Sequence, residues 1–187
     1  MVSTQIDEKN KWQDGRLTMK DQSSKDGPIV GVVGGSTSDF PLLKKATAIL
    51  DELGINNELR VVSAHRTPDW LFEYTESAEA RGIKVIIAGA GGAAHLPGMI
   101  AAKTLIPVIG VPVPLEHLKG MDSLMSIVQM PRGIPVATVA IGGTENAALL
   151  ASEILAISDD KIKSRLRIWR TNLTKSVVNN PEAQVGF

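Results

Sequence analysis

The chain has 187 residues and no cysteine. Disulfides, thiolate metal sites and a cysteine nucleophile are therefore excluded together, and the absence fits a reducing compartment. A metal ion could be bound only by histidine and carboxylate side chains, and no cluster of these with metal-ligand spacing is present. No cofactor fingerprint is present either. We therefore expect neither a metal ion nor an organic cofactor.

The chain also lacks an excess of charge of either sign, with 20 Lys and Arg against 20 Asp and Glu. A neutral protein has no general attraction for nucleic acid or for an anionic bilayer, so we expect neither as a partner. Long hydrophobic runs are missing as well. The longest apolar stretches, residues 85–94 and 105–115, are too short to span a bilayer and are interrupted by Gly or Pro. We expect a soluble protein.

Residues 1–27 lack the periodicity of a helix or a strand and carry five positive and five negative charges. They contain no continuous apolar run, as a signal peptide requires, and they are too acidic for a mitochondrial transit peptide. We therefore expect a flexible N-terminal extension over residues 1–27, a folded domain over residues 28–174 and a C-terminal tail over residues 175–187. By elimination, we expect the protein in the cytoplasm.

Between these ends, short β-branched apolar runs alternate with longer amphipathic segments, which is typical of parallel strands joined by crossover helices. Strands are predicted over residues 29–33, 58–62, 85–88, 108–113 and 136–141. We expect an α/β fold: a three-layer α/β/α sandwich with a five-stranded parallel sheet, flavodoxin-like or Rossmann-like. In such folds, ligands bind outside the carboxyl ends of the strands.

Six helices are predicted, over residues 38–54, 67–82, 95–103, 121–129, 144–157 and 158–174. The apolar stripe of the first consists of Leu42, Ala46, Ile49 and Leu53, and that of the last consists of Ile162, Leu166, Trp169 and Leu173. Thr144 and Ser158 are predicted to cap the last two helices. Both of these helices are so apolar that we expect neighbouring subunits to cover them, although each could simply pack on its own sheet.

The first loop after a strand reads Gly-Gly-Ser-Thr-Ser-Asp at residues 34–39 and leads into a helix. Backbone amides, hydroxyls and the positive helix end would face one cavity there, as in a phosphate-binding loop. The pattern is neither a P-loop nor a dinucleotide fingerprint. Asp39 would repel a phosphate and suits sugar hydroxyls better. Alternatively, Ser38 or Asp39 is an ordinary helix cap and the glycines form a turn.

The second and third loops add a cation and two histidines. In the second loop, residues 63–68, Arg66 offers a fixed cation to a phosphate and His65 can exchange protons near neutral pH, although a lone histidine is more often structural. The third loop, residues 88–98, is so rich in Gly and Ala that a flat ring or a carboxylate could touch its backbone. A tightly packed turn would explain the small residues but not His95. Together the three loops indicate acid–base chemistry on a phosphorylated small molecule.

Three stretches also carry a family resemblance: SAHRTP at residues 63–68, AGAGGAAHLPGM at 88–99 and DSLMSIVQMPRGIPV at 122–136. They closely resemble the N5-carboxyaminoimidazole ribonucleotide mutases of purine biosynthesis, class I of the phosphoribosylaminoimidazole carboxylase catalytic subunit family. The resemblance covers about residues 29–172. It implies an isomerase that converts N5-carboxyaminoimidazole ribonucleotide to 4-carboxy-5-aminoimidazole ribonucleotide without metal or organic cofactor, and an octamer with shared sites.

The resemblance also implies residue roles. Ser36 and Arg66 match phosphate ligands, with Ser38 assisting; Asp39 matches the ribose ligand, and His65 matches the proton shuttle. The loop Gly89–Gly92 matches the wall that holds carbon dioxide released from the substrate. The remaining substrate-binding candidates are Ser63, Ala64, Gly89, Ala90, Gly91 and His95.

The chain departs from the family pattern at Gly34 and Phe40, where Met and Trp are common, so the wall of the nucleotide site is expected to be looser. A related branch, the aminoimidazole ribonucleotide carboxylases, resembles this chain in its first loop but has Lys at the position of Arg66, which favours the mutase. The alternatives are a carboxylase of the same fold and a non-enzymatic module that senses a sugar phosphate, in which His65 would have no task.

Overall fold

The computed structural model describes residues 27–179. The strands are β1 (Val30–Gly34), β2 (Asn57–Val61), β3 (Val85–Gly91), β4 (Val108–Val113) and β5 (Ala137–Thr138). The helices are α1 (Phe40–Glu52), α2 (Pro68–Ala78), α3 (Leu96–Ala101), α4 (Met121–Val128), α5 (Thr144–Ala156) and α6 (Asp160–Val178). All five strands are parallel, in the order β2-β1-β3-β4-β5. The predicted α/β fold with a five-stranded parallel sheet is confirmed.

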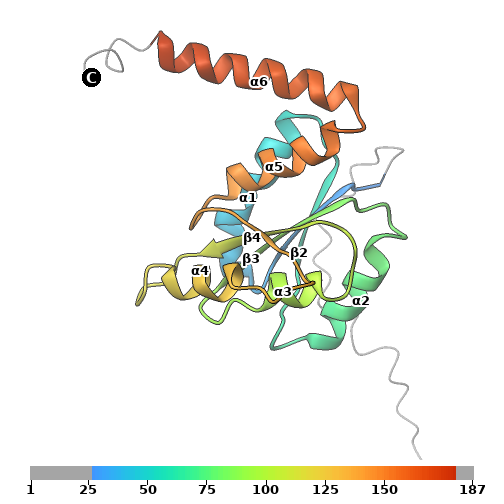
Figure 1. Cartoon of the computed structure of the whole chain (residues 1–187), viewed down its shortest axis with the longest axis vertical. Helices are drawn as coiled ribbons and strands as arrows, with labels where there is room; N and C mark the ends of the chain where they lie inside the picture. The colour runs from blue at the N-terminus through green and yellow to red at the C-terminus, as the bar shows by residue number, and fades with distance from the viewer. Residues whose placement is uncertain (1–26, 180–187) are drawn as a thin grey trace, which may run out of the picture.

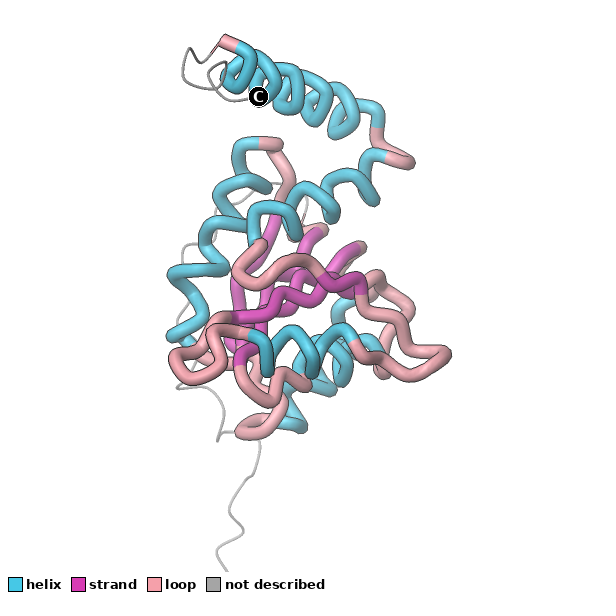
Figure 2. Tube along the Cα trace, turned by 60° about the vertical axis from the view of Figure 1, so that its left-hand side comes forward, coloured by secondary structure: helices cyan, strands magenta, loops and turns pink. Residues whose placement is uncertain are grey.

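Each face of the sheet has its own hydrophobic core, so the molecule has three layers (Figures 1 and 2). Helices α1 and α5 cover one face, where Leu43, Leu50 and Ala151 pack against β1, β3 and β4. Helices α2, α3 and α4 cover the other face through Leu71, Ile100 and Ile127. Strands covered on both faces must be apolar throughout, and β4 is buried at every residue.

The predicted apolar stripe of α1 was half right: Ala46 and Leu53 are buried as predicted, but the other two positions were displaced by one residue. The buried side chains are Leu43, Ala46 and Leu50, while Leu42 and Ile49 are only half-buried. Leu42-Leu43 and Ile49-Leu50 are both apolar pairs spaced by seven residues, so the helical period fits either phase. Packing on the sheet decides between them.

Strand β5 is shorter than the predicted 136–141. Only Ala137 and Thr138 pair with β4. Beyond them the chain still runs along β4, since Val139 N–H donates to the Gly110 carbonyl (3.1 Å) and Gly142 N–H to the Pro112 carbonyl (2.9 Å). Pro112 has no N–H to return a bond at this edge, so the regular ladder ends.

The predicted caps of the last two helices were wrong. Gly143 occupies the N-cap of α5, and Thr144 is buried without capping it. Asp159, not Ser158, caps α6, because its carboxylate accepts hydrogen bonds from Lys161 N–H (2.8 Å) and Ile162 N–H (3.1 Å). An ionised carboxylate is the stronger acceptor for the positive end of a helix.

Helix α6 continues to Val178, beyond the predicted end at Thr174, and crosses above α5 away from the sheet (Figure 1). Its predicted stripe packs only at the start: Ile162 is buried, Trp169 is half-buried and Leu173 is 49% exposed. The predicted N-terminal extension lies outside the described residues except for Gly27, as does the tail beyond Asn179. In residues 27–179, no helix combines the length and the apolar character needed to span a membrane.

Candidate functional site

The three predicted loops meet at the carboxyl ends of β1, β2 and β3. Strand β1 lies between β2 and β3 in the sheet. The chain passes from β1 to β2 on one side and then returns to β3 on the other side of β1. Such a switch point leaves an opening at the strand ends, where α/β proteins bind ligands. Two hydrogen bonds join the loops, one from Arg66 to Gly35 and one between His65 and His95.

The first loop is organised by a reciprocal cap. The Ser36 hydroxyl accepts from Ser38 N–H (3.3 Å), and the Asp39 carboxylate accepts from Ser36 N–H (3.0 Å). Ser36 therefore caps this 3-10 turn, Thr37–Asp39. Asp39 occupies the N-cap position of α1, as one alternative had it, but its side chain makes no capping hydrogen bond to that helix. The Ser36 hydroxyl keeps its own proton, so it can still donate to an anion.

Asp39 is an almost buried carboxyl group at this opening, with 9% of its surface exposed. Burial raises the pKa of Asp39 above its usual range, against the lowering effect of hydrogen bonds from Ser36 and Gly35 and of the Arg66 charge. A fixed acceptor of this kind suits neutral hydroxyl donors.

The second loop holds Arg66 in place from two sides. Its Nε donates to Ser63 Oγ (3.2 Å), and its Nη2 donates to the Gly35 carbonyl of the first loop. Thr67 Oγ1 closes the loop by accepting from Ser63 N–H and donating to the Ser63 carbonyl, both at 3.2 Å. Ser63 and Ala64 are buried, so Ser63 positions the guanidinium, while His65 and Arg66 are exposed.

The third loop differs from the prediction in its first half. Gly89, Ala90 and Gly91 belong to β3 itself, paired with β4. Glycines mark a loop in most sequences, but here they make room for neighbouring side chains. A Cβ atom on Gly89 would lie 2.8 Å from Leu43 Cδ2.

The same leucine fills the space over Gly34, where an added Cβ would lie 2.7 Å from Leu43 Cδ1. Leu43 of α1 thus supplies bulk that Gly34 lacks, and a looser wall of the nucleotide site at Gly34 and Phe40 stays a prediction.

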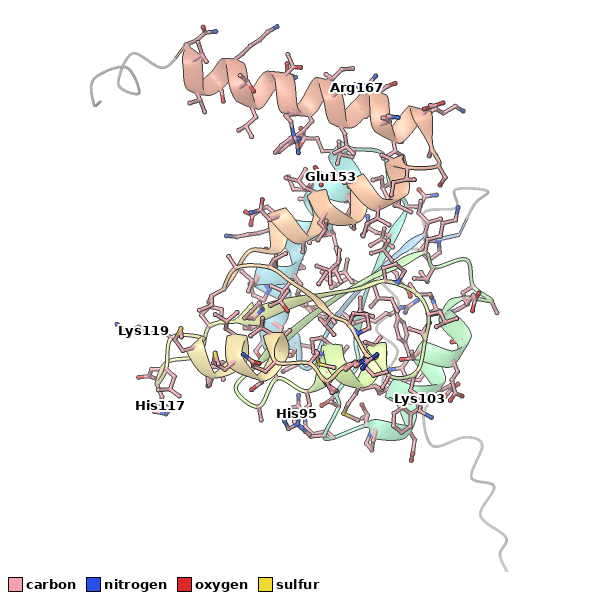
Figure 3. All side chains as sticks on the ribbon, in the orientation of Figure 1. His95, Lys103, His117, Lys119, Glu153 and Arg167 are labelled. Atoms are coloured by element: carbon pink, nitrogen blue, oxygen red, sulfur yellow. The ribbon has the colours of Figure 1, made fainter. Side chains whose placement is uncertain are left out.

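His65 and His95 form a hydrogen-bonded pair, with 2.7 Å between His65 Nε2 and His95 Nδ1. The rings meet edge to face at an interplanar angle of 85°. One nitrogen must donate and the other must accept, so the pair shares a single proton along this bond. Figure 3 shows His95 at the start of α3, at the edge of the molecule remote from α5 and α6.

Sequence reasoning missed four contributors: the Gly35 carbonyl, the Thr67 hydroxyl, and Ser123 and Ser126 of α4, which bond to Gly92. Thr67 follows Ser63 by four residues before a helix, a spacing that could have indicated the turn. The contacts of Ser123 and Ser126 with Gly92 span more than thirty residues, and no spacing rule predicts them.

The arrangement defines a class of protein: an α/β protein of flavodoxin-like strand order, with an open site at the switch point that combines a guanidinium, hydroxyls and a proton-sharing histidine pair. No group of three or more potential metal-ligating side chains was found within the described residues.

The chain belongs to the AIR carboxylase family, whose model matches residues 29–176. It is 61% identical over 155 residues to the N5-carboxyaminoimidazole ribonucleotide mutase of Haemophilus influenzae, covering 82% of this chain and 94% of that protein. It is 58% identical over 160 residues to the mutase of Bacillus subtilis, covering 84% and 99%. The crystal structure of Treponema denticola PurE is similar at a TM-score of 0.77 and 28% identity, covering 85% of this chain and 99% of that one.

Proposed function

We propose that this chain is an N5-carboxyaminoimidazole ribonucleotide mutase, an isomerase of purine biosynthesis that works in the cytoplasm without metal or organic cofactor. Curated relatives that are 53–61% identical carry that name. The observation that carries the proposal is the histidine pair beside Arg66. It lies where hydrogen bonds join the three loops that the sequence analysis selected. The histidine pair can exchange a proton, and Arg66 beside it can bind the substrate's phosphate.

The substrate's phosphate would bind between Arg66 and the first loop. Arg66 is already oriented by Ser63 and Gly35, so little side-chain freedom is lost when an anion binds. The hydroxyls of Ser36 and Ser38 would add donors. Asp39, whose carboxylate is fixed by Ser36 N–H, would accept hydrogen bonds from the ribose hydroxyls.

The imidazole ring and its carboxylate would then face the second and third loops, against Ala64, His95 and the backbone of Gly89, Ala90 and Gly91. Leu43 and Leu115 fill the side-chain space of Gly89 and Gly91, so the substrate would meet the backbone of these residues at the strand end.

The reaction moves one carboxylate and two protons. The carbamate C–N bond breaks, its electron pair stays on nitrogen, and carbon dioxide is released while His65 gives that nitrogen a proton. The ring carbon then attacks carbon dioxide, a C–C bond forms, and His65 takes the proton that the ring carbon loses. His65 ends as it began, so no external acid or base is consumed. Exclusion of water would keep the gas in place.

His95 would assist by holding the His65 ring. Because its Nδ1 faces His65 Nε2 at 2.7 Å, His95 can accept or donate the shared proton as His65 changes charge.

We further propose a homo-oligomer, most simply the octamer of the family resemblance, with substrate sites shared between subunits. Apolar side chains remain on the surface of α6, including Ile168 at 62% and Val177 at 56% exposure. A hollow lined mainly by apolar groups also lies between α5 and α6, at Leu149, Ala156, Ile157, Leu166 and Trp169. Contact with another subunit would remove this surface from water.

The second candidate is a carboxylase that uses free carbon dioxide, in keeping with the name of the matching family model. One experiment separates the two: purified protein is mixed with the carbamate substrate in buffer freed of bicarbonate. A mutase forms 4-carboxy-5-aminoimidazole ribonucleotide under these conditions. Failure to form it, with product appearing only when aminoimidazole ribonucleotide and bicarbonate are supplied, would favour the carboxylase. Binding of the nucleotide without either reaction would favour a sensor.

A further inference from the structure

Gly92, the residue that follows β3, is attached to α4 by two serine side chains. Its N–H donates to Ser123 Oγ (2.9 Å), and its carbonyl accepts from Ser126 Oγ (3.3 Å). Gly92 has a φ of +66°, in the left-handed region that residues with a side chain rarely adopt. The N–H of Gly92 is thus held by α4, whereas its carbonyl is held weakly, because the single hydroxyl proton of Ser126 has a nearer acceptor in the Asp122 carbonyl (2.7 Å).

Ser123 makes the stronger attachment. It is fully buried, and besides accepting from Gly92 it donates its hydroxyl proton to the Val113 carbonyl (2.8 Å) at the end of β4. One hydroxyl therefore links the carboxyl ends of β3 and β4. Loss of that hydroxyl would leave the half-buried N–H of Gly92 and the buried carbonyl of Val113 without this partner, which destabilises their present positions.

Leu115, in the loop that leads from β4 to α4, packs against the same place. An added Cβ on Gly91 would lie 3.1 Å from Leu115 Cγ, and one on Gly92 would lie 3.3 Å from Leu115 Cδ1. The end of β3 therefore packs against the Leu115 side chain and is hydrogen-bonded, through Gly92, to the buried Ser123 hydroxyl. This end is the part of β3 nearest the predicted pocket wall.

We propose that Ser123 is a positioning residue for the reaction: it fixes the peptides of Gly91 and Gly92 so that the pocket retains carbon dioxide between the two chemical steps. This inference rests on the proposed function, which places the gas against Gly89–Gly92. Ser123 itself touches no reacting atom. Its contribution is the shape of the wall, so its loss increases escape of carbon dioxide rather than weakening nucleotide binding.

The test measures how often a turnover ends in escape of carbon dioxide rather than in the carboxylated product. Ser123→Ala and the unaltered protein receive the carbamate substrate without bicarbonate, and the ratio of aminoimidazole ribonucleotide, the product of escape, to 4-carboxy-5-aminoimidazole ribonucleotide is determined, with spontaneous substrate loss subtracted. We expect this ratio to rise at least about fivefold, the effect of one net hydrogen bond. The Kd of the product nucleotide should change less than about twofold.

Ser152→Ala is the matched control. Ser152 is equally buried, and its hydroxyl donates to the Ala148 carbonyl (2.7 Å) within α5, on the other face of the sheet. It should lower the melting temperature without changing the product ratio. Ser126→Ala removes the longer bond to Gly92, together with a 2.7 Å bond from Ser126 Oγ to the Asp122 carbonyl within α4, and should raise the ratio by a smaller factor.

An unchanged ratio in Ser123→Ala, or an equal rise in Ser152→Ala, would overturn the inference. If Ser123→Ala does not fold, Ser123→Cys decides, because a thiol is a weaker donor and acceptor than a hydroxyl, and an unchanged ratio there overturns it. Unaltered protein that forms no product would overturn the proposed function and this inference together, whereas normal turnover with unchanged ratios overturns this inference alone.

Discussion

Two polar clusters of this molecule differ in where their charges find partners. Between β2 and α2, the Glu58 side chain is only 8% exposed, and its carboxylate accepts from Arg81 Nη1 (2.7 Å), Tyr74 Oη (2.9 Å) and Arg60 Nε (3.2 Å). At the three loops, Arg66 is exposed and donates to neutral oxygens of Ser63 and Gly35. In the first cluster both guanidiniums are bonded to the Glu58 carboxylate, whereas in the second the guanidinium is bonded only to neutral oxygens and is exposed at the opening.

The pKa values follow the same division. Burial alone would raise the pKa of Glu58, but the hydrogen bond and charge of Arg81, with help from Tyr74 and Arg60, outweigh it and lower that pKa below its usual range. Burial and the Glu58 charge raise the pKa of Tyr74. At the loops, burial prevails and the pKa of Asp39 is raised. The contrast teaches that a guanidinium bonded to a buried carboxylate is committed to the fold, since breaking the pair leaves a buried charge, whereas an exposed guanidinium bonded to neutral oxygens is available to a ligand.

The largest effect is expected from His65→Asn. Asparagine can hydrogen-bond but cannot exchange a proton, so kcat should fall by about 10² to 10⁴ fold. His65 is exposed, so the melting temperature and the Kd of the product nucleotide should stay nearly unchanged. Stopped assays and calorimetry on the same preparation measure all three. Near-normal turnover would remove His65 from the mechanism.

Arg66→Ala should act on binding, because a charge-assisted bond to phosphate contributes about 1.5 to 3 kcal/mol, or roughly tenfold or more in Kd. Arg60→Ala is the matched control, since Arg60 is bonded to Glu58 and lies outside the three loops. Titration of both variants with the product nucleotide should show weaker binding only for Arg66→Ala. Equal affinity in the two variants would contradict the distinction between the clusters.

Glu58→Gln should act on stability and leave kcat unchanged. It removes the negative charge that Arg81 and Arg60 share, and we expect a loss of about 1 to 3 kcal/mol in the free energy of unfolding. Urea denaturation at neutral pH measures it. A variant with lower kcat and unchanged stability would reverse the roles assigned to the two clusters.

The pH dependence of that loss sharpens the comparison. Because the folded pKa of Glu58 lies below its ordinary value of 4.5, the stabilisation is complete above about pH 4.5 and declines as the pH falls through the folded pKa. The stability difference between the unaltered protein and Glu58→Gln should therefore be constant at neutral pH and narrow in acid below about pH 4.5. A difference that widens in acid would mean that the pKa of Glu58 is raised.

The smallest effect is expected from removal of the N-terminal residues. A chain that starts at Asp26 should fold, assemble and react like the full chain, because the removed residues have no apolar stripe to bury. Melting temperature, elution volume and kcat are the measurements. A lower melting temperature or a smaller assembly would show that the extension is docked.

Local sequence patterns predicted the helices and strands, but not which face of a helix is buried or which residues pack against one another. Alternation of apolar runs was enough for five parallel strands, and residues 108–113 match β4 at both ends. Which of Leu42 and Leu43 is buried depends on packing against the sheet, which the sequence does not show. Gly89 and Gly91 were predicted to lie in a loop, because their close packing against Leu43 and Leu115 leaves no signal in the sequence. The cap of α6 differed because Asp159 competes with its neighbour Ser158 as an acceptor.

The candidate site shows the same limit. His65, Arg66 and Asp39 were recognisable because each lies in a loop that follows a strand. That His65 pairs with His95, and that Arg66 reaches Gly35, depends on the strand order, which brings segments thirty residues apart to one edge. Ser123 lies inside a helix and could only be found in three dimensions.

The most direct test of the account follows the carboxylate carbon. Unaltered protein turns over substrate labelled with ¹³C in the carbamate, in buffer containing unlabelled bicarbonate and carbonic anhydrase, and the product is analysed by mass spectrometry at early times. If the loops retain carbon dioxide for an intramolecular transfer, the label stays in most of the 4-carboxy-5-aminoimidazole ribonucleotide formed. Product with the isotopic composition of the dissolved bicarbonate would contradict the account, because the carboxylate would then come from solution.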